Sequence, residues 1–401
     1  MREEWGRLVA LLLAQFRRLD LVEDALGDAV EAANRTWPVD GVPTNPAGWL
    51  MTAAKRRVVD RLRTEAVAAR KLPLLVTDAD RVQEGVRTMA DSGSLVEDDV
   101  LRLVLMCAHP ALAPEAASAL SLRLVLGVPT ADIARLFLVP EPTMASRITR
   151  AKKRIVGAGI PFAVPDAGVL PERLEIVAQT AYLTFTAGYS PGTGPDLLRA
   201  HQSGEAIRLV RVVLGLRPDE PALVALLALM LLQHSRRDAR VGDGRLVLLA
   251  DQDRTRWHHE EIAEATRLLA RPHLAGPLTP LAASYVLQAR IAAEHATAPS
   301  AQDTRWDRVV GLYDVLLQVA PTPSARLARA VAVAEDQGTA AGLAALEGLE
   351  IPDSHRPAAV RAELLARSGD VDAARAAYDQ AVAACRNDVE RAFLVGKRDA
   401  L

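Results

Sequence analysis

Hydrophobic residues recur at helical spacing along most of this chain, most clearly in residues 120–155. A first apolar pattern begins at Thr130, a plausible N-cap, and continues through Ile133, Ala134, Phe137 and Leu138. The prolines of Val139-Pro-Glu-Pro142 would end that helix. A second apolar stripe follows and consists of Met144, Ile148, Ala151 and Ile155. Two helices separated by a short break predict a helix-turn-helix.

The second helix of this motif carries a polar stripe beside the apolar one. It is turned by about 100°, the rotation of one helical residue, and consists of Thr143, Arg147, Arg150 and Arg154. Residues 140–157 hold five basic side chains and one acid, Glu141, so the local charge favours phosphate. Because the net charge of the whole chain is only −2, contact with nucleic acid would depend on such local patches. A solvated helix in an ordinary bundle is the alternative interpretation.

The first 72 residues predict a three-helix module with a second cationic surface. Asn45-Pro46 predicts the start of the third helix, because Asn can cap it and Pro can occupy the first helical position. The segment before it, residues 37–45, is rich in turn residues and predicts a loop. Residues 55–71 contain seven basic side chains and two acids. Residues 73–98 are acidic and predict a linker, after which residues 99–158 form the helix-turn-helix domain.

Beyond residue 165 the pattern is helix after helix, separated by proline or glycine. The clearest unit begins at Gly369, and its Ala374, Tyr378 and Ala381 show the small-large-small packing pattern of a tetratricopeptide helix. Related units begin near Gly338 and Gly204, and residues 306–320 resemble another such helix. Residues 165–401 therefore predict a stack of helical hairpins, with a plain helical bundle as the alternative.

Composition supports an all-α protein, because 50% of the 401 residues are hydrophobic and only 4% are aromatic. The two cysteines lie far apart and have none of the spacings of zinc or redox motifs, which fits a reducing cytoplasm. The N-terminus lacks the features of a signal peptide. The longest apolar run, residues 222–232, is too short to cross a bilayer and predicts a buried helix. We expect a soluble, cytoplasmic protein.

Two basic helical modules joined by an acidic linker, with the helix-turn-helix second, resemble the promoter-binding domains of an extracytoplasmic-function (ECF) RNA polymerase sigma factor. In the first module the resemblance is carried by Val22-Glu-Asp-Ala25, Trp37-Pro-Val-Asp-Gly-Val-Pro-Thr-Asn-Pro-Ala-Gly-Trp-Leu50 and Asp60-Arg-Leu-Arg63. In the second it is carried by Cys107-Ala-His-Pro-Ala-Leu-Ala-Pro-Glu115, Arg150-Ala-Lys-Lys-Arg-Ile155 and Gly159-Ile-Pro-Phe162. Three further strings resemble the C-terminal tetratricopeptide-like extension of one subgroup: Tyr182-Leu-Thr-Phe-Thr-Ala-Gly-Tyr-Ser190, Asp251-Gln-Asp-Arg-Thr-Arg-Trp257 and Leu312-Tyr-Asp314.

The resemblance implies two partners, promoter DNA and core RNA polymerase, which is met through the β′ clamp helices and the β flap. The polymerase-facing residues would be Leu21, Val22, Asp24, Ala25 and Asp28. Capture of the melted minus-10 element would use Asp40, Gly41, Val42, Pro43, Thr44, Asn45, Lys55, Arg56, Arg57, Arg61 and Arg63. Reading of the minus-35 element would use Glu141, Thr143, Ser146, Arg147, Arg150, Lys153 and Arg154.

Some of these residues also have a purely structural interpretation. Trp49 is expected in the core rather than stacked on a base. Asp60 is expected to form salt bridges that order the neighbouring arginines. The C-terminal hairpins would offer a concave surface for a protein or peptide, and would regulate the sigma activity in cis.

Two other classes of protein remain as alternatives. A metal-dependent enzyme would rest on Asp251-Gln-Asp253 and Trp257-His-His-Glu-Glu261, but no His-x-x-x-His or Glu-x-x-His spacing places two ligands on one helix face. No phosphate-binding loop, nucleophile elbow or dinucleotide fingerprint occurs, so no catalytic residue, metal or cofactor is expected. A duplex-DNA-binding regulator with a tetratricopeptide-like sensor uses the same helix-turn-helix, but leaves residues 20–63 without a role.

Overall fold

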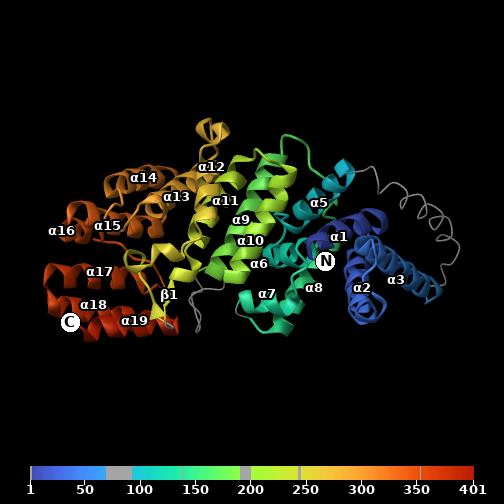
Figure 1. Cartoon of the computed structure of the whole chain (residues 1–401), viewed down its shortest axis with the longest axis horizontal. Helices are drawn as coiled ribbons and strands as arrows, with labels where there is room; N and C mark the ends of the chain where they lie inside the picture. Colours follow the sequence, from blue (N-terminus) through green and yellow to red (C-terminus); the bar gives the residue numbers. More distant parts are fainter. Residues whose placement is uncertain (1, 69–92, 138, 190–199, 243–244, 353) are drawn as a thin grey trace. The chain divides into compact units, whose positions relative to one another are not determined.

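The expected all-α architecture is confirmed in the computed structural model of the chain (Figure 1). The structure describes residues 2–68, 93–137, 139–189, 200–242, 245–352 and 354–401. The chain divides into two compact units, Met1–Thr180 and Ala181–Leu401. None of the helices in these described ranges is long and apolar enough to cross a bilayer.

Unit 1, Met1–Thr180, contains all the elements predicted for the two basic modules. Its helices are α1 (Arg2–Phe16), α2 (Leu19–Asp40), α3 (Pro46–Ala68), α5 (Gly93–Cys107), α6 (Pro114–Leu120), the π-helix η3 (Ser121–Val125), α7 (Thr130–Leu136), α8 (Glu141–Gly157) and the first part of α9 (Leu170–Tyr189). Residues 73–92 of the predicted acidic linker lie outside the described residues, and residues 93–98 belong to α5.

The three predicted helices of the first module are present, with one correction. Helix α2 continues to Asp40 and includes Pro38, so the expected loop of residues 37–45 shrinks to residues 41–45. Pro38 has no N–H to donate to the carbonyl of residue 34, and α2 ends two residues after it. Asn45 does cap α3, since its side-chain oxygen accepts a hydrogen bond from the Gly48 N–H at 2.8 Å.

Helices of the first and second modules share one core in unit 1, because α1 packs against both α5 and η3. The approach is closest at Gly6, where an added Cβ atom would lie 2.2 Å from the carbonyl oxygen of Val125. Any larger residue would have to push the two backbones apart. Gly6 is therefore the position at which α1 and η3 come together.

The helix-turn-helix is formed by α7 and α8, and its predicted apolar stripe is confirmed. Met144, Ile148, Ala151 and Ile155 are all buried on α8, and Ile133 and Ala134 are buried on α7. Thr130 is not the cap that the sequence predicts. It is the first residue of α7, and the N-cap is Pro129, which cannot cap through its side chain. Phe137 follows the helix and is half-buried, and Leu138 lies outside the described residues.

Unit 2, Ala181–Leu401, holds the rest of α9 and the C-terminal helices. These are α10 (Ala200–Leu216), α11 (Pro221–His234), α12 (His259–Leu269), α13 (Pro280–Thr297), α14 (Trp306–Val319), α15 (Pro323–Gln337), α16 (Thr339–Ala345), α17 (Arg356–Ser368), α18 (Val371–Ala384) and α19 (Asp388–Asp399). A two-residue antiparallel ladder joins β1 (Val241–Gly242) to β2 (Arg245–Leu246). Helix α11 is buried on nearly every side, as its continuous apolar run predicts.

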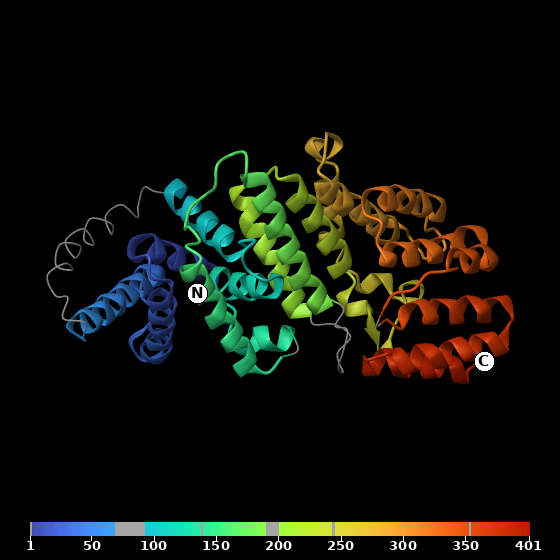
Figure 2. The same ribbon diagram turned by 180° about the vertical axis from the view of Figure 1, so that it is seen from behind.

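Neighbouring helices of unit 2 pair as hairpins, and α17, α18 and α19 lie side by side in both views (Figures 1 and 2). Gly369 makes the turn between α17 and α18 with a φ of 87°, a backbone conformation that favours glycine. The predicted small-large-small residues Ala374, Tyr378 and Ala381 are buried on α18. The unit expected near Gly204 is corrected, because that glycine lies inside α10 rather than at a turn.

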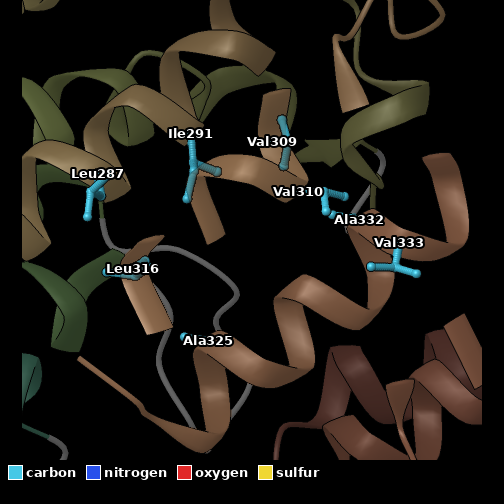
Figure 3. Packing of buried hydrophobic residues seen from close by; sticks show 8 residues of the cluster. All are labelled: Leu287, Ile291, Val309, Val310, Leu316, Ala325, Ala332 and Val333. Carbon is cyan, nitrogen blue, oxygen red and sulfur yellow. The ribbon is translucent and has the colours of Figure 1, made fainter. Parts of the chain in front are cut away.

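The core between α13, α14 and α15 is a cluster of aliphatic side chains (Figure 3). It consists of Leu287, Ile291, Val309, Val310, Leu316, Ala325, Ala332 and Val333. Helix α14, Trp306–Val319, matches the expected helix of residues 306–320 to within one residue. This close-packed cluster holds α13, α14 and α15 together.

Candidate nucleic-acid interface

Helix α8 presents polar residues beside and opposite its buried stripe. Glu141, Thr143, Ser146, Arg150, Lys153 and Arg154 are exposed, and Arg147 is half-buried. Arg150 Nε lies 3.4 Å from the Ser146 carbonyl oxygen, one turn earlier on the same helix. All seven residues expected at the minus-35 element therefore lie together on one helix. An exposed helical face with several cations can lie in a major groove and contact phosphates on either side.

The remaining lysine of α8, Lys152, points into unit 1. Its Nζ contacts the Glu23 carboxylate, and Arg123 Nε lies 2.5 Å from the other oxygen of that carboxylate. Glu23 is only 4% exposed. The Arg123 guanidinium also lies 5.7 Å from the centre of the Trp5 ring. One buried acid on α2 thus holds two cations from the helix-turn-helix domain.

Sequence reasoning missed Glu23, although a signal for it exists. The residue stands on the apolar side of α2, one turn from Leu19 and directly after Val22, both of which are buried. An acid in such a position needs a cationic partner, because burying an unpaired carboxylate is costly. The sequence does not identify the partners, because Arg123 and Lys152 lie 100 and 129 residues away from Glu23.

The basic residues of α3 differ in exposure and in the acids that they contact. Arg56 and Arg63 are exposed, although Arg63 also lies 3.8 Å from Asp60, as expected for that acid. Arg57 and Arg61 are half-buried and bind Asp28 at 3.4 and 2.9 Å, and Arg61 also lies 3.3 Å from Asp24. Two of the expected phosphate ligands are therefore paired with two of the expected polymerase contacts. Burial lowers the pKa of the half-buried Lys55 ammonium.

The expected polymerase face of α2 is split between buried and accessible residues. Leu21, Val22 and Ala25 are buried, with Leu21 and Ala25 packed against Val58 of α3. In this arrangement these three side chains offer little or no surface to another protein. Asp24 is exposed and Asp28 is half-buried.

Two tryptophans flank the loop expected to receive a melted base. Trp37 and Trp49 meet edge to face, with ring centroids 5.5 Å apart and an interplanar angle of 69°. Both are half-buried, so Trp49 is less enclosed than its expected place in the core implies. Asp40 ends α2, and in the loop Gly41, Val42, Thr44 and Asn45 are exposed, whereas Pro43 is half-buried. Sequence reasoning assigned no role to Trp37; its signal was a tryptophan at the start of a turn-rich segment.

Close groups of metal-ligating side chains are few in the part of the chain that the structure describes. The histidines next to Trp257 form no site: His258 Nε2 lies 2.7 Å from Asp238, and His259 is exposed at the start of α12. The single group of three candidate ligands found among the described residues is His355, Cys385 and Glu390. There, His355 and Glu390 form an ion pair at 3.3 Å, and the Cys385 thiol donates to the Asn387 carbonyl.

Comparison with known proteins gives the chain its family. Residues 102–155 match the model of Sigma-70, region 4, which covers α7 and nearly all of α8. Residues 173–273 match a family of unknown function, DUF6596. An uncharacterized protein of Rhizobium meliloti (strain 1021) is 40% identical over 390 residues, which cover 96% of this chain and 90% of that protein. No solved structure matches. The chain therefore belongs to one family with this rhizobial protein, and its residues 102–155 are similar to region 4 of the sigma-70 factors.

Proposed function

We propose that this protein is a sigma factor of the ECF type, which binds core RNA polymerase and directs it to specific promoters. The observation that carries the proposal is α8, whose apolar stripe is buried while its basic face is exposed. Such a helix can lie in a major groove with its N-terminal side chains against base edges. Thr143, Ser146 and Arg147 would read the minus-35 element, and Arg150, Lys153 and Arg154 would hold phosphates.

The first module would capture the melted minus-10 strand. Its exposed loop of residues 41–45 begins and ends beside the Trp37–Trp49 pair, and aromatic rings stack on unpaired bases. Arg56 and Arg63 would contact the backbone of the same strand. A regulator that binds only duplex DNA needs no such loop, so this feature favours the sigma factor over that alternative.

Polymerase contact would use Asp24 and Asp28 on α2 for the β′ clamp helices, and the region 4 domain for the β flap. These two acids are engaged by Arg57 and Arg61. When DNA binds, the two arginines would leave the acids and contact DNA phosphates, and the acids could then contact the polymerase. Action on promoter DNA would place the protein in the cytoplasm, as an initiation factor rather than an enzyme.

Run-off transcription with purified core RNA polymerase tests the proposal on the promoter upstream of the protein's own gene and on neighbouring promoters. We expect a transcript of one discrete length that appears only when the protein is added. Arg150→Ala should reduce that transcript, whereas Arg290→Ala, which removes an exposed arginine of α13, should not. A protein that binds promoter duplexes equally well without polymerase, and yields no transcript with it, would be a duplex-binding regulator.

The tetratricopeptide-like unit 2 would regulate this activity in cis. Helix α9 runs through the boundary between the units, and Arg173 on it donates to the Leu105 carbonyl of unit 1 at 2.7 Å. A shortened chain should therefore keep α9 complete and end at residue 189. Its transcript yield should differ from that of the full chain. Equal yield and equal affinity for core polymerase would reject regulation by unit 2.

A further inference from the structure

Unit 2 contains a cavity of about 460 Å³ among α9, α11, α13, α14 and α15. Helix α13 contributes one complete face to it, because Ser284, Gln288, Ile291 and His295 recur at helical spacing. The volume lies within the range of small-molecule sites. No role in DNA or polymerase binding has been assigned to any residue that lines this cavity.

One part of the cavity wall is apolar and firmly packed. Ile291, Leu316 and Ala325 line the cavity and also belong to the aliphatic cluster between α13, α14 and α15 (Figure 3). Their side chains are held by the core behind them, so this wall has a fixed shape. It can pack against the hydrocarbon body of a ligand.

A second part of the wall is polar and internally ordered. Gln288 donates from Nε2 to Ser284 Oγ at 3.0 Å, and its Oε1 lies 3.5 Å from the Tyr182 hydroxyl. Tyr182 in turn meets Tyr285 edge to face at 5.4 Å. Burial raises the pKa of Tyr313, another lining residue, to about 12, so its hydroxyl remains a donor at neutral pH.

Positive charge gathers at one end of the cavity. Arg236 lines it, and Arg254 Nη1 donates to the carbonyls of His295 and Ala298 at 2.9 Å each. Arg254 is fixed further by Trp257, whose ring centre lies 4.3 Å from its guanidinium carbon. Burial and these two arginines lower the pKa of His295 to about 4, so its ring is neutral at pH 7. The side chains that line this cavity of unit 2 include no Asp or Glu.

Three strings that stand out in the sequence meet at this cavity. Tyr182 comes from the first, Tyr313 from the string of residues 312–314, and Arg254 from residues 251–257. Tyr182 and Tyr313 line the cavity, and Arg254 supports the last turn of α13 behind it. Two segments whose tyrosines lie 131 residues apart thus supply aromatic rings and hydroxyls to one site, and the third segment supports the helix that forms its wall.

We propose that this cavity binds a small organic anion, with a carboxylate or phosphate beside Arg236 and an apolar body against Ile291 and Leu316. The excess of positive charge and the hydroxyl and amide donors suit the anionic group, and the aliphatic wall suits the body. The binding claim stands apart from the proposed role in transcription, because the test needs neither DNA nor polymerase.

Titration calorimetry and thermal unfolding of the purified full chain test the site. The charged probes are phenylacetate, hexanoate and phenyl phosphate, and the neutral probes are phenylacetamide and hexanamide. We expect at least one charged probe to bind and raise the melting temperature, with at least tenfold lower affinity for its neutral counterpart. Preference for carboxylates or for the phosphate then identifies the anionic group.

Two variants and a control locate the binding. Arg236→Gln should weaken binding of the charged probe at least tenfold, and Ala328→Phe should do the same by filling the cavity while both arginines remain. Arg211→Gln is the control, because it removes a positive charge and one ion pair, to Glu264 at 2.6 Å, elsewhere in unit 2. If R236Q does not fold, A328F still tests whether the charged probe binds in the cavity. Equal binding of charged and neutral probes, no binding of any charged probe, or unchanged binding by A328F would overturn the proposal.

Discussion

Glu23 and Arg123 stand 100 residues apart in the sequence and form an ion pair with a 2.5 Å contact between Oε1 and Nε. Lys152 contacts the second oxygen of the same carboxylate. The Glu23 side chain is 5% exposed, and those of Arg123 and Lys152 are 23% and 18% exposed. A single acid therefore ties α2 of the first module to two positions in the region 4 domain.

Removing that acid should destabilise unit 1. In Glu23→Gln both cations lose their buried partner, and breaking a buried ion pair in this way costs about 3–5 kcal/mol. Glu31→Gln is a matched control on the same helix, because Glu31 pairs with Arg35 at 3.0 Å and both side chains are 67% exposed. That change should cost at most about 0.5 kcal/mol. Urea unfolding measures both, and equal losses would show that the Glu23 contacts contribute nothing special.

The adjacent lysines of α8 should behave differently toward DNA. Lys153 is exposed, so Lys153→Ala should weaken promoter binding and reduce the slope of log affinity against log salt by about 1. Lys152 is engaged by Glu23, so Lys152→Ala should leave that slope unchanged. Promoter binding by the reconstituted polymerase complex at several salt concentrations provides the measurement. A larger slope change for Lys152 would mean that its contact with Glu23 breaks when DNA binds.

Two glycines of the C-terminal hairpins should respond to alanine with opposite signs. Gly369 has a φ of 87° and no atom within 4 Å of an added Cβ, so the cost of Gly369→Ala comes from the backbone alone. We expect a loss of about 1–2 kcal/mol. Gly396 lies inside α19 with the same open surroundings, and Gly396→Ala should gain about 1 kcal/mol from helix propensity. Thermal unfolding of the two variants compares them, and shifts of the same sign would contradict the assigned turn.

The stability of unit 2 should fall in mild acid because of His295. Its pKa is lowered to about 4 by burial and by Arg236 and Arg254, whereas in the unfolded chain the ring regains its ordinary value near 6.5. Between these values the unfolded chain binds more protons, so stability present above pH 6.5 is lost as the pH falls toward 4. From pH 7.5 to 5 the loss is about 2 kcal/mol.

The comparison that isolates this effect is between the wild type and His295→Gln. Denaturant unfolding of both at pH 7.5 and 5 should show the variant losing about 2 kcal/mol less than the wild type on acidification. The glutamine side chain has no proton to gain, so the other titrating groups contribute equally to both proteins. An identical pH dependence would mean that the pKa of His295 is the same in the folded and the unfolded chain.

Sequence patterns correctly predicted the features that depend on residues close together in the chain. The stripe of Met144, Ile148, Ala151 and Ile155 was read correctly because helical burial repeats within a few residues. Asn45 was recognised as a cap for the same reason. Thr130 was misplaced because a proline before it can start a helix without a side-chain hydrogen bond. The run through Pro38 was misread because a proline marks a frequent but not an obligatory helix end, and α2 continues for two residues past it.

The candidate site could be predicted only in part, because its ion pairs connect distant segments. The exposed residues of α8 followed from their position relative to the apolar stripe. The burial of Leu21, Val22 and Ala25 could not be predicted, since the same apolar face could contact a partner or the core of the chain itself. The partners of Glu23 and the cavity lined by α13 depend on how helices far apart in sequence meet, which periodicity does not record.

The contact at Gly6 determines when α1 can fold into its final place during synthesis. Helix α1 leaves the ribosome more than 100 residues before Val125, whose backbone lies against Gly6. The amino-terminal helix cannot reach its final place until the π-helical segment has also been synthesised, so the first module alone lacks part of its native support. Nascent chains released before residue 125 should therefore leave α1 open to proteolysis, while chains that include the region 4 domain should protect it.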